Sequence, residues 1–129
     1  MKRILLIEDD YDLAHSIVLG IELIKSPRVK IEVQYEGFSA LARVQSPPAL
    51  DVLLLDMHLP NVAGQDIYLA VRQKAPDCKV MIVTADVRLA KEMSEKQGDW
   101  EYLPAPDAIF TKPFSLMELV GSARVLLRK

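Results

Sequence analysis

Hydrophobic residues fall into two alternating patterns along the chain: short continuous runs and longer segments with helical spacing. Continuous runs of this length are typical of strands that are covered on both faces of a sheet. They occupy residues 4–7, 52–55, 79–85 and 108–110. Residues 30–35 instead alternate polar and apolar side chains, which predicts a strand with one face in water, at the edge of the sheet.

The segments with helical spacing follow the predicted strands one by one. Their apolar residues recur every three or four positions, which predicts amphipathic helices with one buried face. We expect these helices between Leu13 and Ile24, and at residues 38–44, 65–74, 88–96 and 116–127. Strand and helix thus alternate five times, which predicts an α/β fold with a parallel sheet and helices on both of its faces.

Composition and charge limit the classes of protein to consider. The chain has 129 residues, 50% of them hydrophobic, so we expect residues 1–129 to form one domain with a sizeable core. The formal net charge of −2 offers no basic surface for nucleic acid. No apolar run approaches the roughly 18 residues of a membrane span, and the run in "MKRILLIEDD" is too short for a signal peptide. The single Cys78 cannot form an intramolecular disulfide, so we expect a cytoplasmic location.

Polar and charged residues directly follow four of the predicted strands. The carboxyl ends of parallel strands meet at one edge of a sheet, where α/β proteins bind their ligands. If the first, third, fourth and fifth strands are neighbours, the residues at their ends converge. These residues are Glu8, Asp9 and Asp10, then Asp56, then Thr84, and finally Thr111, Lys112 and Pro113.

Three acids, Glu8, Asp9 and Asp56, would then share a small volume. Like charges about 4 Å apart repel by about 4 kcal/mol at an effective dielectric constant of about 20, so the cluster needs a proton or a cation. Carboxylates with few other ligands suit Mg²⁺, which keeps several of its waters. With Lys112 and Thr84 beside such a metal, the arrangement can receive a phosphoryl group, and Asp56 is the carboxylate left to act as nucleophile.

Each of these residues also has a purely structural explanation. Asp9 and Asp10 could cap and charge the start of the first helix, and Thr84 could be an ordinary β-branched strand residue. Asp56 by itself is more typical of a turn, and "KPF" at Lys112 of a helix entry. The functional interpretation therefore depends on finding all of these residues at strand ends of one alternating chain.

Taken together, these motifs resemble the receiver domain (CheY-like) of bacterial two-component response regulators. The resemblance lies in "ILLIEDD", "EGFSALARV", "IVTA" and "TKPF", and in Asp56 followed by Pro60 and Gly64. It covers nearly the whole chain, residues 1–129. The resemblance implies a flavodoxin-like (βα)5 fold, whose five-stranded parallel sheet has the strand order 2-1-3-4-5.

The resemblance also implies a role for each residue of the cluster. Asp56 is the expected phosphoacceptor, Asp9 a direct ligand of Mg²⁺, and Glu8 a ligand that acts mostly through water. Thr84 and Lys112 are expected to contact the phosphoryl group.

Two further features near the site follow from the same resemblance. The backbone carbonyl of His58 is expected to complete the protein ligands of Mg²⁺, and the Lys112–Pro113 peptide bond is expected to be cis. The side chains of His58 and Asp86 are expected to tune hydrolysis of the phosphoryl group.

The implied activity is that of a phosphorylatable regulator, not of an enzyme with a free substrate. A sensor histidine kinase or a phosphotransfer protein presents a phosphohistidine, and Asp56 takes the phosphoryl group in a reaction that the domain itself catalyses. The acyl phosphate later hydrolyses slowly. Phosphorylation shifts a two-state equilibrium, which an output domain or a partner protein reads.

Two features of the chain depart from the pattern of this family. Ile109 stands where an aromatic residue usually partners the threonine, and Phe110 is predicted to face the opposite side of the sheet. The segment "GDWEYLPAP", residues 98–106, lengthens the approach to the fifth strand. It could form a surface for a partner or a homodimer, but we favour a loop that folds back over apolar surface between the last two helices.

Three other functions compete with this interpretation. A flavodoxin-like cofactor binder would require a Gly/Ser/Thr-rich phosphate-binding loop where this chain has Glu8 and Asp9. A hydrolase with an aspartyl-phosphate nucleophile would carry a second acid two positions after Asp56, where this chain has His58. A pseudo-receiver interaction module, with weak or no phosphorylation switching, is the alternative that Ile109 keeps open.

Overall fold

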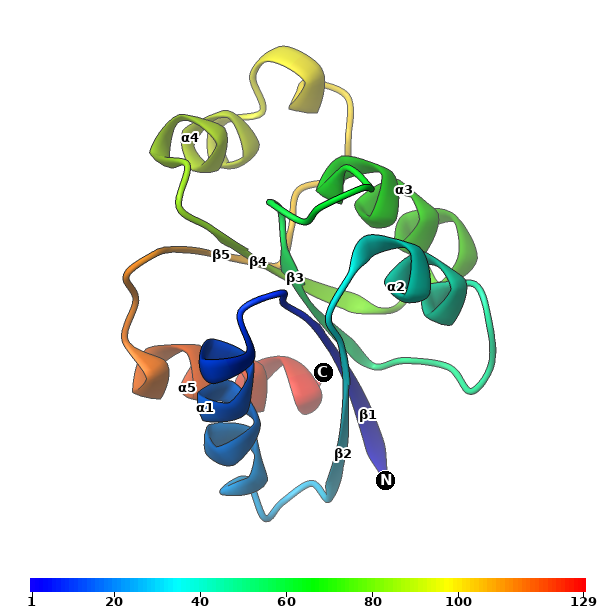
Figure 1. The fold of residues 1–129 in the computed structure, drawn as a ribbon, viewed down its shortest axis with the longest axis vertical. Coiled ribbons are helices and arrows are strands. Elements are labelled where there is room, and N and C mark those ends of the chain that lie inside the picture. The colour runs from blue at the N-terminus through cyan, green and yellow to red at the C-terminus, as the bar shows by residue number, and fades with distance from the viewer.

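The fold is a five-stranded parallel sheet between two layers of helices, seen in a computed structural model that describes residues 1–129. The strands are β1 (Lys2–Ile7), β2 (Val29–Gln34), β3 (Val52–Asp56), β4 (Lys79–Thr84) and β5 (Ala108–Thr111). The helices are α1 (Tyr11–Glu22), α2 (Gly37–Val44), α3 (Gly64–Lys74), α4 (Val87–Glu95) and α5 (Leu116–Leu127), with a short 3₁₀ turn at Gly98–Trp100. The strand order β2-β1-β3-β4-β5 confirms the predicted fold class (Figure 1).

The two faces of the sheet carry separate hydrophobic cores. Figure 1 shows α1 and α5 on one side of the sheet and α2 and α3 on the other. Successive residues of a strand point to opposite faces: Leu53 and Leu55 of β3 pack toward α2 and α3, whereas Val52 and Leu54 pack toward α1 and α5. A strand in the middle of this sheet is therefore apolar at successive positions between its polar ends, which explains the short continuous runs in the sequence.

The strand β2 lies at one edge of the sheet, as its alternating pattern predicted. Every residue of β3 is buried, whereas no residue of β2 is fully buried. The other edge strand, β5, is also incompletely buried, although its short apolar run gave no sign of an edge position. Solvent exposure on one side thus shapes the sequence of β2 more than that of β5.

Side-chain caps fix where the helices on the site's edge of the sheet begin. Asp10 accepts a hydrogen bond from the backbone N–H of Leu13 at 3.1 Å, and Ser115 caps α5 in the same way. The helix α1 ends at Glu22, earlier than its apolar spacing predicted, so the buried Ile24 lies in the following turn. None of the helices combines the length and apolar character that crossing a bilayer requires.

Gly64 lets α3 begin directly against the end of β3. A Cβ atom at this position would lie 2.7 Å from both the Cα and the carbonyl oxygen of Met57, closer than packed atoms approach. The absence of a side chain therefore permits the close contact between the first residue of α3 and the residue that follows Asp56. This contact holds the β3–α3 loop, residues 57–63, beside the site.

The 98–106 segment folds back onto the protein through its tryptophan. Trp100 is 2% exposed and packs edge-on against the ring of Tyr68 in α3, with ring centroids 5.0 Å apart. Met93 of α4 belongs to the same core cluster. The expectation of a loop that covers apolar surface is confirmed, but its position was wrong: the loop packs on α3 and α4, not between α4 and α5.

Polar contacts to α3 hold the rest of this segment in place. The hydroxyl of Tyr68 donates to the carbonyl oxygen of Pro104 at 2.5 Å. Arg72 donates to the Tyr68 hydroxyl at 3.1 Å and to the carbonyl oxygen of Ala105 at 3.0 Å. Asp107 lies just before β5. Its Oδ2 accepts hydrogen bonds from Nη2 of Arg72 at 3.4 Å and from the backbone N–H of Val80 at 2.8 Å. The segment is thus part of the packed fold.

We expect Trp100→Ala to destabilise the protein by about 3–5 kcal/mol, because it removes a large buried ring from a packed core. Urea unfolding followed by far-UV circular dichroism measures this change, since the variant loses its only tryptophan. The matched control is Tyr102→Ala in the same segment. Tyr102 is 89% exposed, so its change should stay within about 0.5 kcal/mol. Equal effects of the two substitutions would contradict the packing described here.

Candidate functional site

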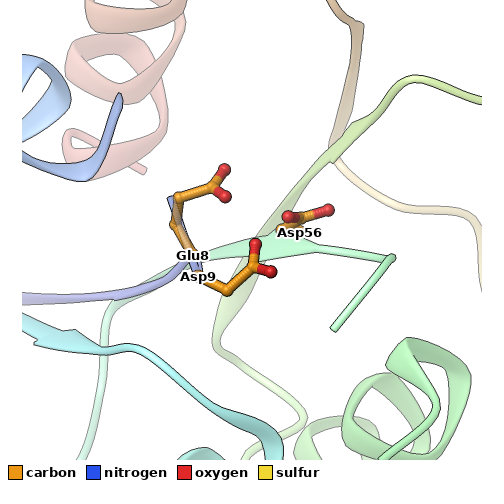
Figure 2. Close-up of side chains that lie close together, drawn as sticks. All are labelled: Glu8, Asp9 and Asp56. Carbon is orange, nitrogen blue, oxygen red and sulfur yellow. The ribbon is translucent and has the colours of Figure 1, made fainter. Parts of the chain in front are cut away.

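Three carboxylates meet at the carboxyl edge of the sheet. Glu8, Asp9 and Asp56 each place a carboxylate oxygen within 4.8 Å of the others. Figure 2 shows Glu8 and Asp9 at the end of β1 and Asp56 at the end of β3. Glu8 is 1% exposed and Asp56 is 3% exposed, whereas Asp9 is open to solvent. The cluster therefore combines two buried acids with one that lies at the surface.

Strand register explains why residues so far apart in sequence converge here. β1 and β3 pair with Ile7 opposite Leu55, so that Glu8 and Asp56 come next on adjacent strands. On the other side of β3, β4 ends at Thr84, which pairs with Thr111 of β5. Lys112 follows Thr111, and its backbone N–H donates to the carbonyl oxygen of Thr84 at 2.8 Å. The four strand ends thus deliver the acids, the hydroxyl and the lysine to one place.

The ammonium group of Lys112 lies between two of the carboxylates. Its Nζ is 3.1 Å from Oε1 of Glu8 and 3.4 Å from Oδ2 of Asp56. Burial alone would lower the pKa of Lys112, but the charges of Asp56 and Glu8 outweigh it, and the pKa is raised. Lys112 therefore remains charged and neutralises part of the acidic cluster.

The pKa of Glu8 indicates that the negative charge of the site is incompletely neutralised. Its burial, followed by the negative charge of Asp56, raises the pKa of Glu8 from 4.5 to about 7, against the opposing effect of Lys112. One ammonium group thus does not balance the acids, and a cation would fill the deficit. Hard carboxylate oxygens from Glu8, Asp9 and Asp56 suit Mg²⁺, so the donor set fits this metal.

Thr84 and His58 make a contact that the sequence analysis did not anticipate. The Thr84 side chain is fully buried, and its Oγ1 accepts the backbone N–H of Asp86 at 3.0 Å. The same oxygen lies 3.0 Å from Nε2 of His58. The backbone N–H of His58 in turn donates to Oδ1 of Asp56 at 3.0 Å. Because β3 and β4 are neighbours, the position of His58, two residues after Asp56, could have suggested this contact.

The residues around Lys112 agree with the expectations drawn from the resemblance. The Lys112–Pro113 peptide bond is cis. Ile109 packs against the core cluster on the α3 and α4 side of the sheet, whereas Phe110 faces the other core and packs edge-on against Phe114, with ring centroids 6.2 Å apart. Phe110 therefore does not replace the aromatic partner of Thr84, as predicted.

Comparison with known proteins identifies the class of this protein. The sequence matches the family of response regulator receiver domains over residues 4–124. The chain therefore belongs to this family, the receiver domains of two-component systems, which are regulatory phosphoacceptor modules and not classical enzymes. The cluster of Glu8, Asp9 and Asp56 is typical of the Mg²⁺ site in receivers.

Individual relatives agree with this assignment. The response regulator ArlR of Staphylococcus saprophyticus is 30% identical over 129 residues, which cover all of this chain and 54% of ArlR. A putative transcriptional regulator of Haloferax volcanii is 31% identical over 125 residues, which cover 96% of this chain and 19% of that protein. The chain thus spans about half, or less, of the length of these curated relatives.

Solved structures share the fold over nearly the whole chain. A CheY-like receiver domain protein of Methanospirillum hungatei has a TM-score of 0.80 at 20% identity, covering 99% of this chain and 94% of that one. The response regulator TrrA of Thermotoga maritima, solved in complex with Mg²⁺-BeF, has a TM-score of 0.73 at 26% identity. That comparison covers 98% of this chain and 99% of TrrA.

The raised pKa of Glu8 predicts how the metal-free protein responds to pH. Between about pH 4.5 and pH 7 the folded state holds a proton on Glu8 that the unfolded state has lost. The contribution of Glu8 to stability is therefore fully present below about pH 4.5 and is lost as the pH rises through about 7. Urea unfolding in the presence of a chelator, across this range, should show a shallower fall in the free energy of unfolding for Glu8→Gln. The same slope in both proteins would contradict the pKa assigned to Glu8.

Proposed function

We propose that Asp56 accepts a phosphoryl group from the phosphohistidine of a histidine kinase or phosphotransfer protein, within a receiver domain formed by residues 1–129. The observation that carries this proposal is the position of Lys112, whose Nζ bridges Glu8 and Asp56 at the carboxyl ends of the strands. A buried aspartate beside a fixed ammonium group has its nucleophilic oxygens oriented and the incoming negative charge partly neutralised.

The chemical step is a displacement at phosphorus. An oxygen of Asp56 forms the new O–P bond, the P–N bond of the phosphohistidine breaks, and the electron pair returns to the imidazole of the partner. The backbone N–H of His58 holds Oδ1 of Asp56 at 3.0 Å, and Lys112 holds Oδ2 at 3.4 Å, so both oxygens are oriented before the partner arrives. Lys112 then offsets charge on the transferred group, and Thr84 supplies a hydroxyl to one of its oxygens.

Magnesium is the cofactor that this site would hold. Asp9 and Asp56 would be direct ligands, Glu8 would act mostly through water, and the backbone carbonyl of His58 would complete the protein ligands. When bound, the ion would offset the negative charge of the phosphoryl oxygens and of the acids. The complex of TrrA with Mg²⁺-BeF supports this assignment, because TrrA is 26% identical to this chain over nearly its full length.

The result of phosphorylation would be a change in equilibrium between two conformations, read by an output domain of the same protein or by a separate partner. The regulators ArlR and the Haloferax protein are longer than the matched region, which supports a division between receiver and output functions. The second candidate function is a pseudo-receiver that binds partners without a phosphorylation switch. Ile109, which places a half-buried aliphatic side chain where the family usually has an aromatic residue, is the observation that favours it.

We expect acetyl phosphate with Mg²⁺ to add one phosphoryl group to the protein, and Asp56→Asn to abolish this modification. Intact-mass spectrometry measures it directly. Asp66→Asn is the matched control, because Asp66 is an exposed acid in the first turn of α3 and should leave the labelling unchanged. Equal labelling of the Asp56→Asn variant and the unmodified sequence would refute the proposed phosphoacceptor.

Substitution of Asp9 tests the metal ligands separately. We expect Asp9→Asn to weaken Mg²⁺ binding roughly tenfold or more, because even the residues that orient metal ligands typically contribute 10- to 100-fold. The measurement is a titration with MgCl₂, followed by the amide NMR signals around Asp56. Asp12→Asn, an exposed acid in the first turn of α1, should leave the affinity nearly unchanged. A similar loss in both variants would indicate a general effect of charge and not a ligand.

A further inference from the structure

The hydroxyl of Thr84 is held by two partners in the structure. The backbone N–H of Asp86 donates to Oγ1 of Thr84 at 3.0 Å. In the second contact, Nε2 of His58 lies 3.0 Å from the same oxygen. A hydroxyl has one hydrogen and two lone pairs, so these two contacts fix the direction in which Oγ1 points. No hydrogen bond joins Thr84 to Asp56, although both lie at adjacent strand ends.

His58 is the only side chain that contacts this hydroxyl by a hydrogen bond. The neighbouring strand β5 offers none, because Ile109 is aliphatic and Phe110 faces the opposite core. The His58 side chain is exposed, and it belongs to the β3–α3 loop. Its ring can therefore move away from Thr84 into solvent without disturbing the core.

We propose that His58 is a positioning residue, which holds the Thr84 hydroxyl in the unphosphorylated protein and releases it when Asp56 is phosphorylated. The proposal rests on the function proposed above. A phosphoryl group on Asp56 offers the Thr84 hydroxyl a charged acceptor, and bonds to charged acceptors are roughly twice as strong as neutral ones. When Thr84 turns to that acceptor, the 3.0 Å contact with His58 is lost and the imidazole becomes free.

This exchange gives the chain a way to report phosphorylation without an aromatic residue at position 109. The part that changes is the β3–α3 loop, which carries His58 and is tied to Asp56 through the His58 N–H. The imidazole contacts Thr84 in one state and is free of it in the other. A partner that contacts this loop would therefore meet a different surface in the two states.

A double-mutant cycle tests whether His58 acts through the Thr84 hydroxyl. The four proteins are the unmodified sequence, His58→Ala, Thr84→Val and the double variant, and the probe is Mg²⁺ with beryllofluoride at one fixed pH. His58→Ala removes the competitor for the hydroxyl, so it should tighten beryllofluoride binding roughly two- to tenfold, the range of one net hydrogen bond. In the Thr84→Val background, which lacks the hydroxyl, the same substitution should change nothing.

The amide NMR spectrum gives the affinity of each protein. An equal effect of His58→Ala in both backgrounds, or no effect in either, would overturn the proposal while leaving the phosphoacceptor role of Asp56 intact. If the unmodified protein does not bind beryllofluoride at all, the proposed function fails, and this inference fails with it. The two failures are thus distinguishable.

A nuclear Overhauser measurement tests the geometry of the release. The chain has two histidines, and the exposed His15 on α1 provides an internal reference. The free protein should show a contact between the His58 ring protons and the Thr84 methyl group, and beryllofluoride should abolish it, leaving the His15 contacts unchanged. Persistence of the His58–Thr84 contact in the beryllofluoride complex would overturn the proposal.

Discussion

The arrangement of the site depends on the ammonium group of Lys112, which lies between the carboxylates of Glu8 and Asp56. Two buried acids at adjacent strand ends repel each other, and without this cation the carboxyl edge of the sheet would hold uncompensated charge. The position of Lys112 depends in turn on β5, since the residue before it pairs with Thr84. The stability of the strand ends and the chemistry of Asp56 therefore depend on the same electrostatic contact.

The spacing of hydrophobic residues predicted most of the fold, because central parallel strands and amphipathic helices each produce a distinct pattern of apolar positions in the sequence. β3, apolar at each position before Asp56, and β2, with alternating exposure, each revealed their place in the sheet. The end of α1 was less well predicted, since Ile24 continues the apolar spacing after the helix has stopped. A buried side chain in a turn satisfies the same hydrophobic pattern as one in a helix, so the pattern alone does not distinguish them.

The site could be predicted to the extent that it consists of strand ends. Glu8, Asp9 and Asp56 converge because parallel register aligns the ends of neighbouring strands, which the order of elements already implies. The bond between His58 and Thr84 depends instead on a side-chain rotamer in a loop, for which the sequence has no periodic signal. The packing of Trp100 on Tyr68 was missed for a similar reason, because the loop that carries it has no repeating pattern.

The exposed Tyr102 lies between two firmly held neighbours, the buried Trp100 and Pro104, whose carbonyl accepts the Tyr68 hydroxyl. A side chain at this position contributes little to the core, while the backbone that presents it is fixed from both sides. Selection can therefore change residue 102 without endangering folding, and the acidic cluster around Asp56 is not involved. In evolutionary terms, this short segment offers the protein a place to acquire or lose a recognition partner by single substitutions.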